Sequence, residues 1–122
     1  MNDVLQTFAD AFDRCWLCGV KAINTWPPRL EIHHIARGCN RKKGQYERCN
    51  LVRTCQRCHA ERLDGMPVAM QYALKLLHDR DGYDRVVLNL LRGRADDAVD
   101  ELDVFAAYIQ LVDSGYPYPK WS

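Results

Sequence analysis

Hydrophobic residues recur with a helical period in some stretches of this chain and with a strand period in others. Residues 3–14 place apolar side chains on one face of a helix, for which Asn2 or Asp3 is the expected N-cap. Residues 30–36 and 50–54 are short, weakly alternating and rich in β-branched side chains, which predicts two strands that pair with each other. The first half of the chain is therefore expected to hold a helix and a small hairpin.

The rest of the chain is predicted to be helical. Residues 55–63 are expected to form a cysteine turn that runs into a short helix, and further helices are expected over residues 67–78, 83–91 and 96–113. Pro67 suits a first helical turn, Gly93 suits a helix end, and Asp96 or Asp97 is the expected N-cap of the last helix. The apolar stripe expected to face the core from this last helix consists of Val99, Leu102, Phe105, Ala106, Ile109 and Val112.

Composition places the chain among ordinary soluble globular proteins. Hydrophobic residues make up 48% and charged residues 27% of its 122 residues, which suits a single domain with a modest core. We therefore expect one compact unit with two parts, 1–64 and 65–122. No apolar run is long enough to cross a bilayer, and the N-terminus lacks the basic and apolar regions of a signal peptide. These features predict an intracellular, cytoplasmic protein without a membrane partner.

Charge is distributed unevenly along the chain. Residues 1–62 carry 11 Lys and Arg against 6 Asp and Glu, a net charge of +5, whereas residues 63–122 carry 6 against 10, a net charge of −4. The basic half predicts a polyanionic partner, and the acidic helical half predicts either a solvated face or a contact with a protein partner. Salt-sensitive contacts with a DNA phosphate backbone are expected in the connection between the strands, from Arg37, Arg41, Lys42, Lys43 and Arg48.

The cysteines include two C-x-x-C pairs. Cys15 and Cys18 form the first pair and Cys55 and Cys58 the second, with 36 residues between them. Four thiolates at this local spacing are typical of a closed, tetrahedral, structural zinc site. In a reducing compartment such pairs are better explained by metal binding than by disulfides. The gap is longer than in a compact zinc ribbon, so other functional residues are expected between the pairs.

Other interpretations of the cysteines are weaker. A redox C-x-x-C is typical of a thioredoxin-like βαβ setting, which the hydrophobic pattern does not predict. Residues 55–59 match the C-x-x-C-H of c-type haem attachment, but haem would leave the first pair unexplained in a chain that shows no export signal. Cys39 and Cys49 are expected to remain free thiols, with Cys49 an alternative to one of the four zinc ligands.

Between the two cysteine pairs lie a tandem histidine, His33-His34, and an isolated asparagine, Asn50. A third histidine, His59, directly follows the second pair. They occur in the segments LEIHHI (30–35), CNLV (49–52) and CQRCHAER (55–62). This order resembles the HNH nucleases over about residues 15–63. The resemblance implies a ββα-metal fold, in which two antiparallel strands and a helix surround one divalent cation. The expected fold class is therefore α+β: an HNH core with a structural four-cysteine zinc site, an N-terminal helix and a C-terminal extension of about three helices.

The resemblance also implies roles for the histidines. His34 would be the general base that activates water, and His33 and His59 would hold the catalytic cation. These roles suit the chemistry of imidazole, which is partly neutral near pH 7 and is a common metal ligand. Leu63 stands where some members have a third histidine ligand. Two protein ligands and more waters favour Mg²⁺ or Mn²⁺ over a tightly held Zn²⁺.

Three further residues receive roles from the same resemblance. Glu31 would orient the general base, as in histidine-pair members such as the colicin nucleases. Asn50 would tie the loop between the strands, and Arg62 would contact phosphate. Because neighbouring residues on a regular strand face opposite ways, the strand that carries His33 and His34 is expected to end or twist there.

These observations predict a metal-dependent HNH endonuclease that hydrolyses phosphodiester bonds in DNA. Small phage-type HNH proteins suggest a nuclease positioned by a protein partner, in the host cytoplasm if the chain is encoded by a phage. The alternative is a zinc-stapled module that binds nucleic acid or protein without catalysis, with the acidic helical part as its docking surface.

Overall fold

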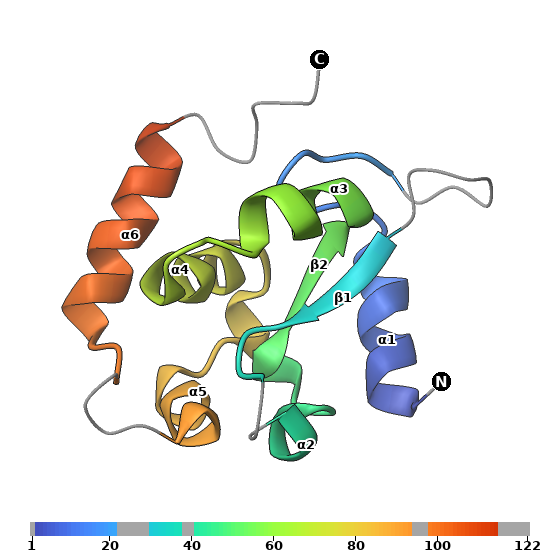
Figure 1. The fold of residues 1–122 in the computed structure, drawn as a ribbon, viewed down its shortest axis with the longest axis horizontal. Helices are drawn as coiled ribbons and strands as arrows, with labels where there is room; N and C mark the ends of the chain where they lie inside the picture. The colour runs from blue at the N-terminus through green and yellow to red at the C-terminus, as the bar shows by residue number, and fades with distance from the viewer. Residues whose placement is uncertain (1, 22–29, 38–40, 94–97, 115–122) are drawn as a thin grey trace.

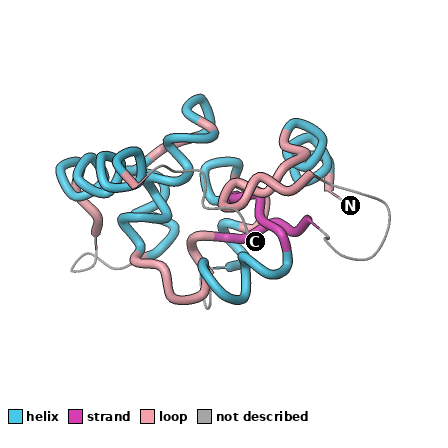
Figure 2. Tube along the Cα trace, turned by 90° about the horizontal axis from the view of Figure 1, so that it is seen from above, coloured by secondary structure: helices cyan, strands magenta, loops and turns pink. Residues whose placement is uncertain are grey.

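The computed structural model describes residues 2–21, 30–37, 41–93 and 98–114 as helices arranged around a two-stranded sheet (Figure 1). Its elements are α1 (Asp3–Ala11), β1 (Leu30–His34), α2 (Arg41–Gly44), η2 (Arg48–Asn50), β2 (Leu51–Cys55), α3 (Gln56–Cys58), η3 (His59–Leu63), α4 (Val68–His78), η4 (Arg80–Gly82), α5 (Arg85–Arg92) and α6 (Glu101–Asp113). The mixed α and β character expected from the sequence is confirmed. Seen from above, the helices of the second half gather on one side of the strands (Figure 2).

The predicted hairpin is present and has a regular register. β1 and β2 pair antiparallel, from Leu30 opposite Cys55 to His34 opposite Leu51. β2 begins one residue later than expected because Asn50 belongs to the 3₁₀ turn η2. β1 ends at His34, two residues earlier than expected, and both histidines of the tandem pair in regular register with β2.

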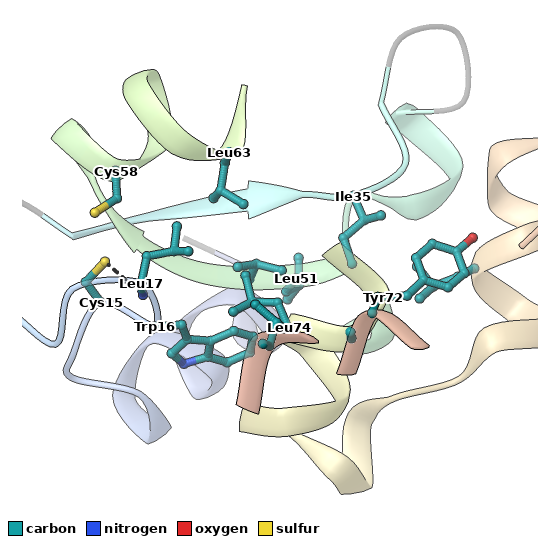
Figure 3. Packing of buried hydrophobic residues seen from close by; sticks show 14 of the residues in the cluster. Cys15, Trp16, Leu17, Ile35, Leu51, Cys58, Leu63, Tyr72 and Leu74 are labelled. Carbon is teal, nitrogen blue, oxygen red and sulfur yellow. Dashed lines mark hydrogen bonds between the residues drawn. The ribbon is translucent and has the colours of Figure 1, made fainter. Parts of the chain in front are cut away.

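The short helix expected within residues 55–63 is present in two pieces. α3 makes a single turn that is capped by the side chain of Cys55. η3 continues it as a π-helix. This form is rare in proteins overall, and where it occurs it is often at a functional site. Leu63, at the end of η3, points toward the sheet, whereas Cys58 points toward Cys15 (Figure 3). One short helical segment therefore serves both the core and a cysteine cluster.

The N-terminal helix begins where predicted and ends early. Asn2 caps α1 through its side chain. The helix ends at Ala11, three residues earlier than expected, because the chain turns there. The turn lets Phe8, Phe12 and Trp16 pack ring against ring, with centroids 5.0 to 5.7 Å apart. Such aromatic packing fixes the first cysteine pair against the helix that precedes it.

The hydrophobic core includes both halves of the chain. One cluster of buried side chains contains Phe8 of α1, Leu51 of β2, Leu74 of α4, Leu88 of α5 and Leu111 of α6. α4 is its central helix and contacts both β2 and α6. Figure 3 shows the side chains of the first half and of α4 interleaved in this cluster.

A buried ion pair joins α4 to the sheet and to η2. Lys75 is fully buried, and its Nζ donates to the carbonyl oxygen of Leu51 at 2.9 Å and to Oδ2 of Asp79 at 2.8 Å. The ammonium also lies over the ring of Phe8, 4.8 Å from its centroid. Burial lowers the pKa of Lys75 to about 8, against the opposing effect of Asp79. Arg48 donates to the same carboxylate at 3.0 Å, so the buried charges compensate one another.

The last two helices differ from the prediction in where they begin. α5 starts at Arg85 with Asp84 as its N-cap, and it ends as predicted at Gly93, whose φ of 69° is left-handed. α6 starts at Glu101, because Asp100 is the residue whose side chain caps it. The caps expected for this helix lie outside the described residues: Asp96 and Asp97.

The buried face of α6 is not the predicted stripe. Against the core lie Val104, Ala107 and Leu111, whereas most of the predicted stripe is exposed: Leu102, Phe105, Ala106, Ile109 and Val112. Val99 is buried, but it precedes the helix. The helix carries two apolar faces, and periodicity alone favours the bulkier one. α4 packs on the other face, where the small side chain of Ala107 lets the two helices approach closely.

Some predictions concern residues outside the described ranges. The free thiol expected at Cys39 is one of them. Among the helices that the structure describes, none combines the length and the apolar character that crossing a membrane requires.

Candidate functional site

Four cysteines from the two C-x-x-C pairs form a buried cluster. The Sγ atoms of Cys15, Cys18, Cys55 and Cys58 all lie within 4.8 Å of one another, and those of Cys18 and Cys55 are 3.8 Å apart. Four sulfurs bound to one zinc ion at about 2.3 Å would form a tetrahedron with edges of about 3.8 Å. The cysteine cluster can therefore bind a metal ion such as zinc.

The turns around these cysteines aim backbone N–H groups at the sulfurs. The N–H of Leu17 donates to Sγ of Cys15, and the N–H of Cys58 donates to Sγ of Cys55, each at 3.4 Å. Gly19 closes the first turn with a φ of 77°, a conformation that other residues rarely adopt. Donation to sulfur favours the thiolate, which is the form that binds metal.

Burial acts unequally on the cluster thiols. Burial opposes ionisation of Cys15, but N–H groups of Cys18, Cys55 and Leu17 outweigh it, so the pKa of Cys15 lies below its ordinary value. Burial raises the pKa of the Cys18 thiol to about 11. A bound cation favours the thiolate form of both. Cys49 is buried outside the cluster, and burial raises its pKa to about 11, so the structure gives the alternative ligand no support.

A second polar group lies where β1, η3 and α4 meet. Nδ1 of His33 is 3.1 Å from Nε2 of His59, with the two rings nearly perpendicular at 80°. The outer nitrogens have polar partners: Nε2 of His33 lies 2.8 Å from Oε1 of Gln71, and Nδ1 of His59 lies 2.9 Å from Oε1 of Glu31. We call these four residues the histidine group. His33 is buried, whereas 32% of the His59 side chain is accessible, so the group opens to solvent on one side.

The outer hydrogen bonds decide which ring nitrogens are basic. Amide and carboxylate oxygens only accept, so Nε2 of His33 and Nδ1 of His59 carry protons and donate them. Burial lowers the pKa of His33 to about 4, against the opposing bond to Gln71, so this ring is neutral near pH 7. In the neutral form of both rings the facing nitrogens carry lone pairs, which repel unless a proton or a metal cation lies between them. Two nitrogens bound at right angles to one cation at about 2.1 Å lie about 3.0 Å apart.

Glu31 and His34 have partners other than those expected. Glu31 hydrogen-bonds to His59, a predicted metal ligand, rather than orienting the predicted base. Nε2 of His34 lies 3.0 Å from the carbonyl oxygen of Gln45, to which it donates, so Nδ1 is its basic nitrogen. Residues 31 and 33 share one face of the strand and residue 34 faces the other way, which places Glu31 on the side of His33.

Asn50 joins the two ends of the connection between the strands. Its Oδ1 accepts from the N–H of Ala36 at 2.6 Å, and its Nδ2 donates to the carbonyl oxygens of Ala36 and Gly44, each at 3.1 Å. A Cβ on Gly44 would stand 2.7 Å from Nδ2 of Asn50, so glycine is required for this approach. Asn50 is fully buried and holds the connection that also positions His34.

The basic residues of the connection differ in their surroundings. Nη2 of Arg37 lies 3.6 Å from Asp64 in an exposed ion pair, and such pairs are weak. Arg48 is engaged by the buried carboxylate of Asp79. Lys43 is exposed. The side chains that lie outside the described part of the chain are those of Arg41 and Lys42.

Arg62 connects the two candidate sites. Its Nη1 donates to the carbonyl oxygen of Leu17 at 3.4 Å, inside the first cysteine turn. The residue predicted to contact phosphate therefore also ties η3 to the cysteine cluster.

Sequence reasoning missed Gln71 as part of the histidine group. Gln71 and Lys75 are the polar residues one turn apart in an otherwise largely apolar stretch of α4, and both are buried. The spacing of these two polar residues is the sequence signal that could have identified Gln71. It is weak, because glutamine and lysine on an amphipathic helix are usually exposed.

Comparison with known proteins finds no family model, no curated protein and no solved structure that matches this chain. The cysteine cluster offers four sulfurs and is closed, whereas the histidine group offers two basic nitrogens and is partly open.

Proposed function

We propose that this protein is a metal-dependent endonuclease of the HNH type that hydrolyses phosphodiester bonds in DNA. The observation that carries the proposal is the pair of basic nitrogens, Nδ1 of His33 and Nε2 of His59, facing each other at 3.1 Å. Support comes from their setting: an antiparallel hairpin is followed directly by a helical segment, and His34 adjoins His33.

In this proposal each residue has a defined task. His33 and His59 hold a divalent cation, Mg²⁺ or Mn²⁺, through the facing nitrogens. When bound, the cation supplies positive charge that stabilises the leaving oxygen and the phosphate. His34 takes a proton from the attacking water at Nδ1, because its Nε2–H is donated to the carbonyl of Gln45. Glu31 holds the ring of His59 in the tautomer that keeps Nε2 basic.

The remaining residues bind the phosphate backbone or hold the connection between the strands in place. Asn50 keeps the connection closed, so the end of β1 and the carbonyl that orients His34 stay in place. Arg37 and Lys43 attract the phosphate backbone without reading its sequence. The cysteine cluster would hold a zinc ion with a structural role only, because four sulfur ligands would leave the ion no open position for a substrate.

Plasmid cleavage tests the catalytic proposal. Purified protein should nick plasmid DNA with Mg²⁺ or Mn²⁺, and His34→Ala should reduce the rate by about 10²-fold or more, as loss of a general base does. The melting temperature should fall by no more than a few degrees, because the substitution removes the hydrogen bond to the carbonyl of Gln45. His78→Phe is the matched control, because this histidine stacks on Trp16 and has no role in the proposed reaction, and it should cleave like the wild type. Absence of nicking with either cation, or an unchanged rate in His34→Ala, would rule out this catalytic role.

A second candidate function is docking of a protein partner on α6. The favouring observation is the exposed apolar face of this helix, formed by Leu102, Phe105, Ile109 and Val112, whose exposed fractions are 79%, 60%, 44% and 49%. Contiguous apolar surface of this kind is typical of interaction sites. Partner binding should survive His34→Ala and be lost in Phe105→Asp, as measured by pull-down with quantified input. Equal binding by the two variants would exclude α6 as the docking surface.

A further inference from the structure

The helical second half contributes a side chain to the histidine group. Gln71 of α4 is buried, with 6% of its surface accessible. Its Oε1 lies 2.8 Å from Nε2 of His33, and its Nε2 donates to the carbonyl oxygen of Met66 at 2.9 Å. Both ends of the amide are thus engaged, one by the sheet and one by the turn that precedes α4.

These two contacts fix the direction of the amide. The carbonyl of Met66 can only accept, so the NH₂ group of Gln71 must face it and Oε1 must face His33. Oε1 in turn only accepts, so the proton of the His33 ring must sit on Nε2. A neutral imidazole has one N–H, and the basic nitrogen of His33 is consequently Nδ1, the atom that faces His59.

We propose that Gln71 is a positioning residue of the divalent cation site, setting the tautomer and the ring orientation of His33 so that Nδ1 is presented to the cation. This inference rests on the proposed function of the histidine group. Glu31 does the same for His59 from the other side, so each ligand ring is held by an acceptor on its outer nitrogen. Outer partners of this kind typically change metal affinity by about 10- to 100-fold.

A merely structural role for Gln71 makes a different prediction. A bridge between α4 and β1 would contribute to stability, and its loss would lower the melting temperature without changing which nitrogen of His33 is protonated. The tautomer of His33 and the affinity for the cation therefore separate the two roles.

The test compares two substitutions of similar size. Gln71→Met removes the acceptor, and Gln71→Glu keeps an oxygen that can accept from His33. Ring ¹⁵N chemical shifts of the zinc-loaded protein, without a second metal, report the tautomer, and titration with Mn²⁺ reports affinity. We expect the wild type and Gln71→Glu to keep the proton of His33 on Nε2. Gln71→Met should move it at least partly to Nδ1 and weaken Mn²⁺ binding by about 10- to 100-fold.

Each outcome decides a separate question. If the wild type binds Mn²⁺ and Gln71→Met keeps both the tautomer and an affinity within about twofold, Gln71 has no positioning role and the inference is wrong. If the wild type binds no Mn²⁺ beyond the cysteine cluster, the proposed function fails and the inference fails with it. Gln71→Asn, whose shorter amide cannot reach both partners, replaces Gln71→Met if that variant does not fold, and the same changes are expected.

Discussion

The cysteine cluster and the histidine group contain neighbouring residues, Cys58 and His59, but they differ in their donor atoms and in their exposure to solvent. Cys58 is fully buried and joins three residues with the same donor atom. His59, the next residue, has an accessible side chain and meets partners from β1. A closed set of identical donors suits a structural ion, whereas a partly open set with outer hydrogen bonds suits chemistry on an exchangeable ligand.

The difference teaches how one short helical segment can serve two purposes. Successive residues on a helix point about 100° apart, so Cys58 and His59 can face separate sites from one backbone. Arg62 then ties the segment back to the first cysteine turn. Stability and chemistry are therefore expected to respond separately to substitution in the two sites.

Cys58→Ser should have the largest effect, because structural zinc supplies folding free energy of about 10–16 kcal/mol in small zinc proteins, as much as a typical domain's whole stability. We expect loss of zinc and of cooperative unfolding, measured by elemental analysis and circular dichroism. Cys49→Ser is the control, because this buried thiol lies outside the cluster, and it should keep one zinc per chain. A folded, zinc-free Cys58→Ser protein would refute the structural site.

His59→Ala should separate the two sites. It removes one basic nitrogen of the histidine group from a partly exposed position, so Mn²⁺ affinity should fall by more than about 100-fold. The zinc content and the melting temperature should stay close to those of the wild type. Isothermal titration calorimetry of zinc-loaded protein provides the measurement. Loss of zinc in this variant would show that the two sites are not independent.

Acid should weaken the fold through a histidine beside the cysteine cluster. His78 stacks on Trp16 with ring centroids 5.0 Å apart, and burial lowers the pKa of His78 to about 4. The unfolded chain therefore takes up this proton at a higher pH than the folded chain, so stability falls as the pH drops from about 6.5 to about 4. His78→Phe keeps the stacking and should flatten this part of the denaturation profile. Since acid also releases zinc from thiolates, the difference between the two proteins is the quantity to measure.

Arg62→Ala should have a small effect on folding. It removes the hydrogen bond to Leu17, and such a bond contributes about 1 kcal/mol, or a few degrees in melting temperature. If Arg62 also contacts phosphate, cleavage should fall further than this loss of stability explains, and Arg62→Lys should restore part of it. An unchanged cleavage rate in Arg62→Ala would leave the residue with a structural role only.

The comparison also shows what sequence can and cannot supply. The cysteine cluster follows from local spacing, because C-x-x-C turns are short-range geometry and four sulfurs of one kind suit few alternatives. The hairpin follows from local pattern as well. Gln71 and the partner of Glu31 did not follow, because both depend on which segments meet in space. The prediction of the buried face of α6 was wrong for the same reason. The helix has two apolar faces, and packing against α4 determines which of them is buried.

The buried ammonium of Lys75 limits how the two halves of this chain can be separated by recombination. Its bond to the carbonyl of Leu51, together with the bond from Gln71 to His33, means that the hairpin draws polar partners from α4. A segment ending near residue 64 would leave the carbonyl of Leu51 and the ring of His33 without these partners. We expect that the hairpin with its cysteines cannot be moved between proteins as a cassette, and that recombination at the sequence boundary between the two halves would be selected against.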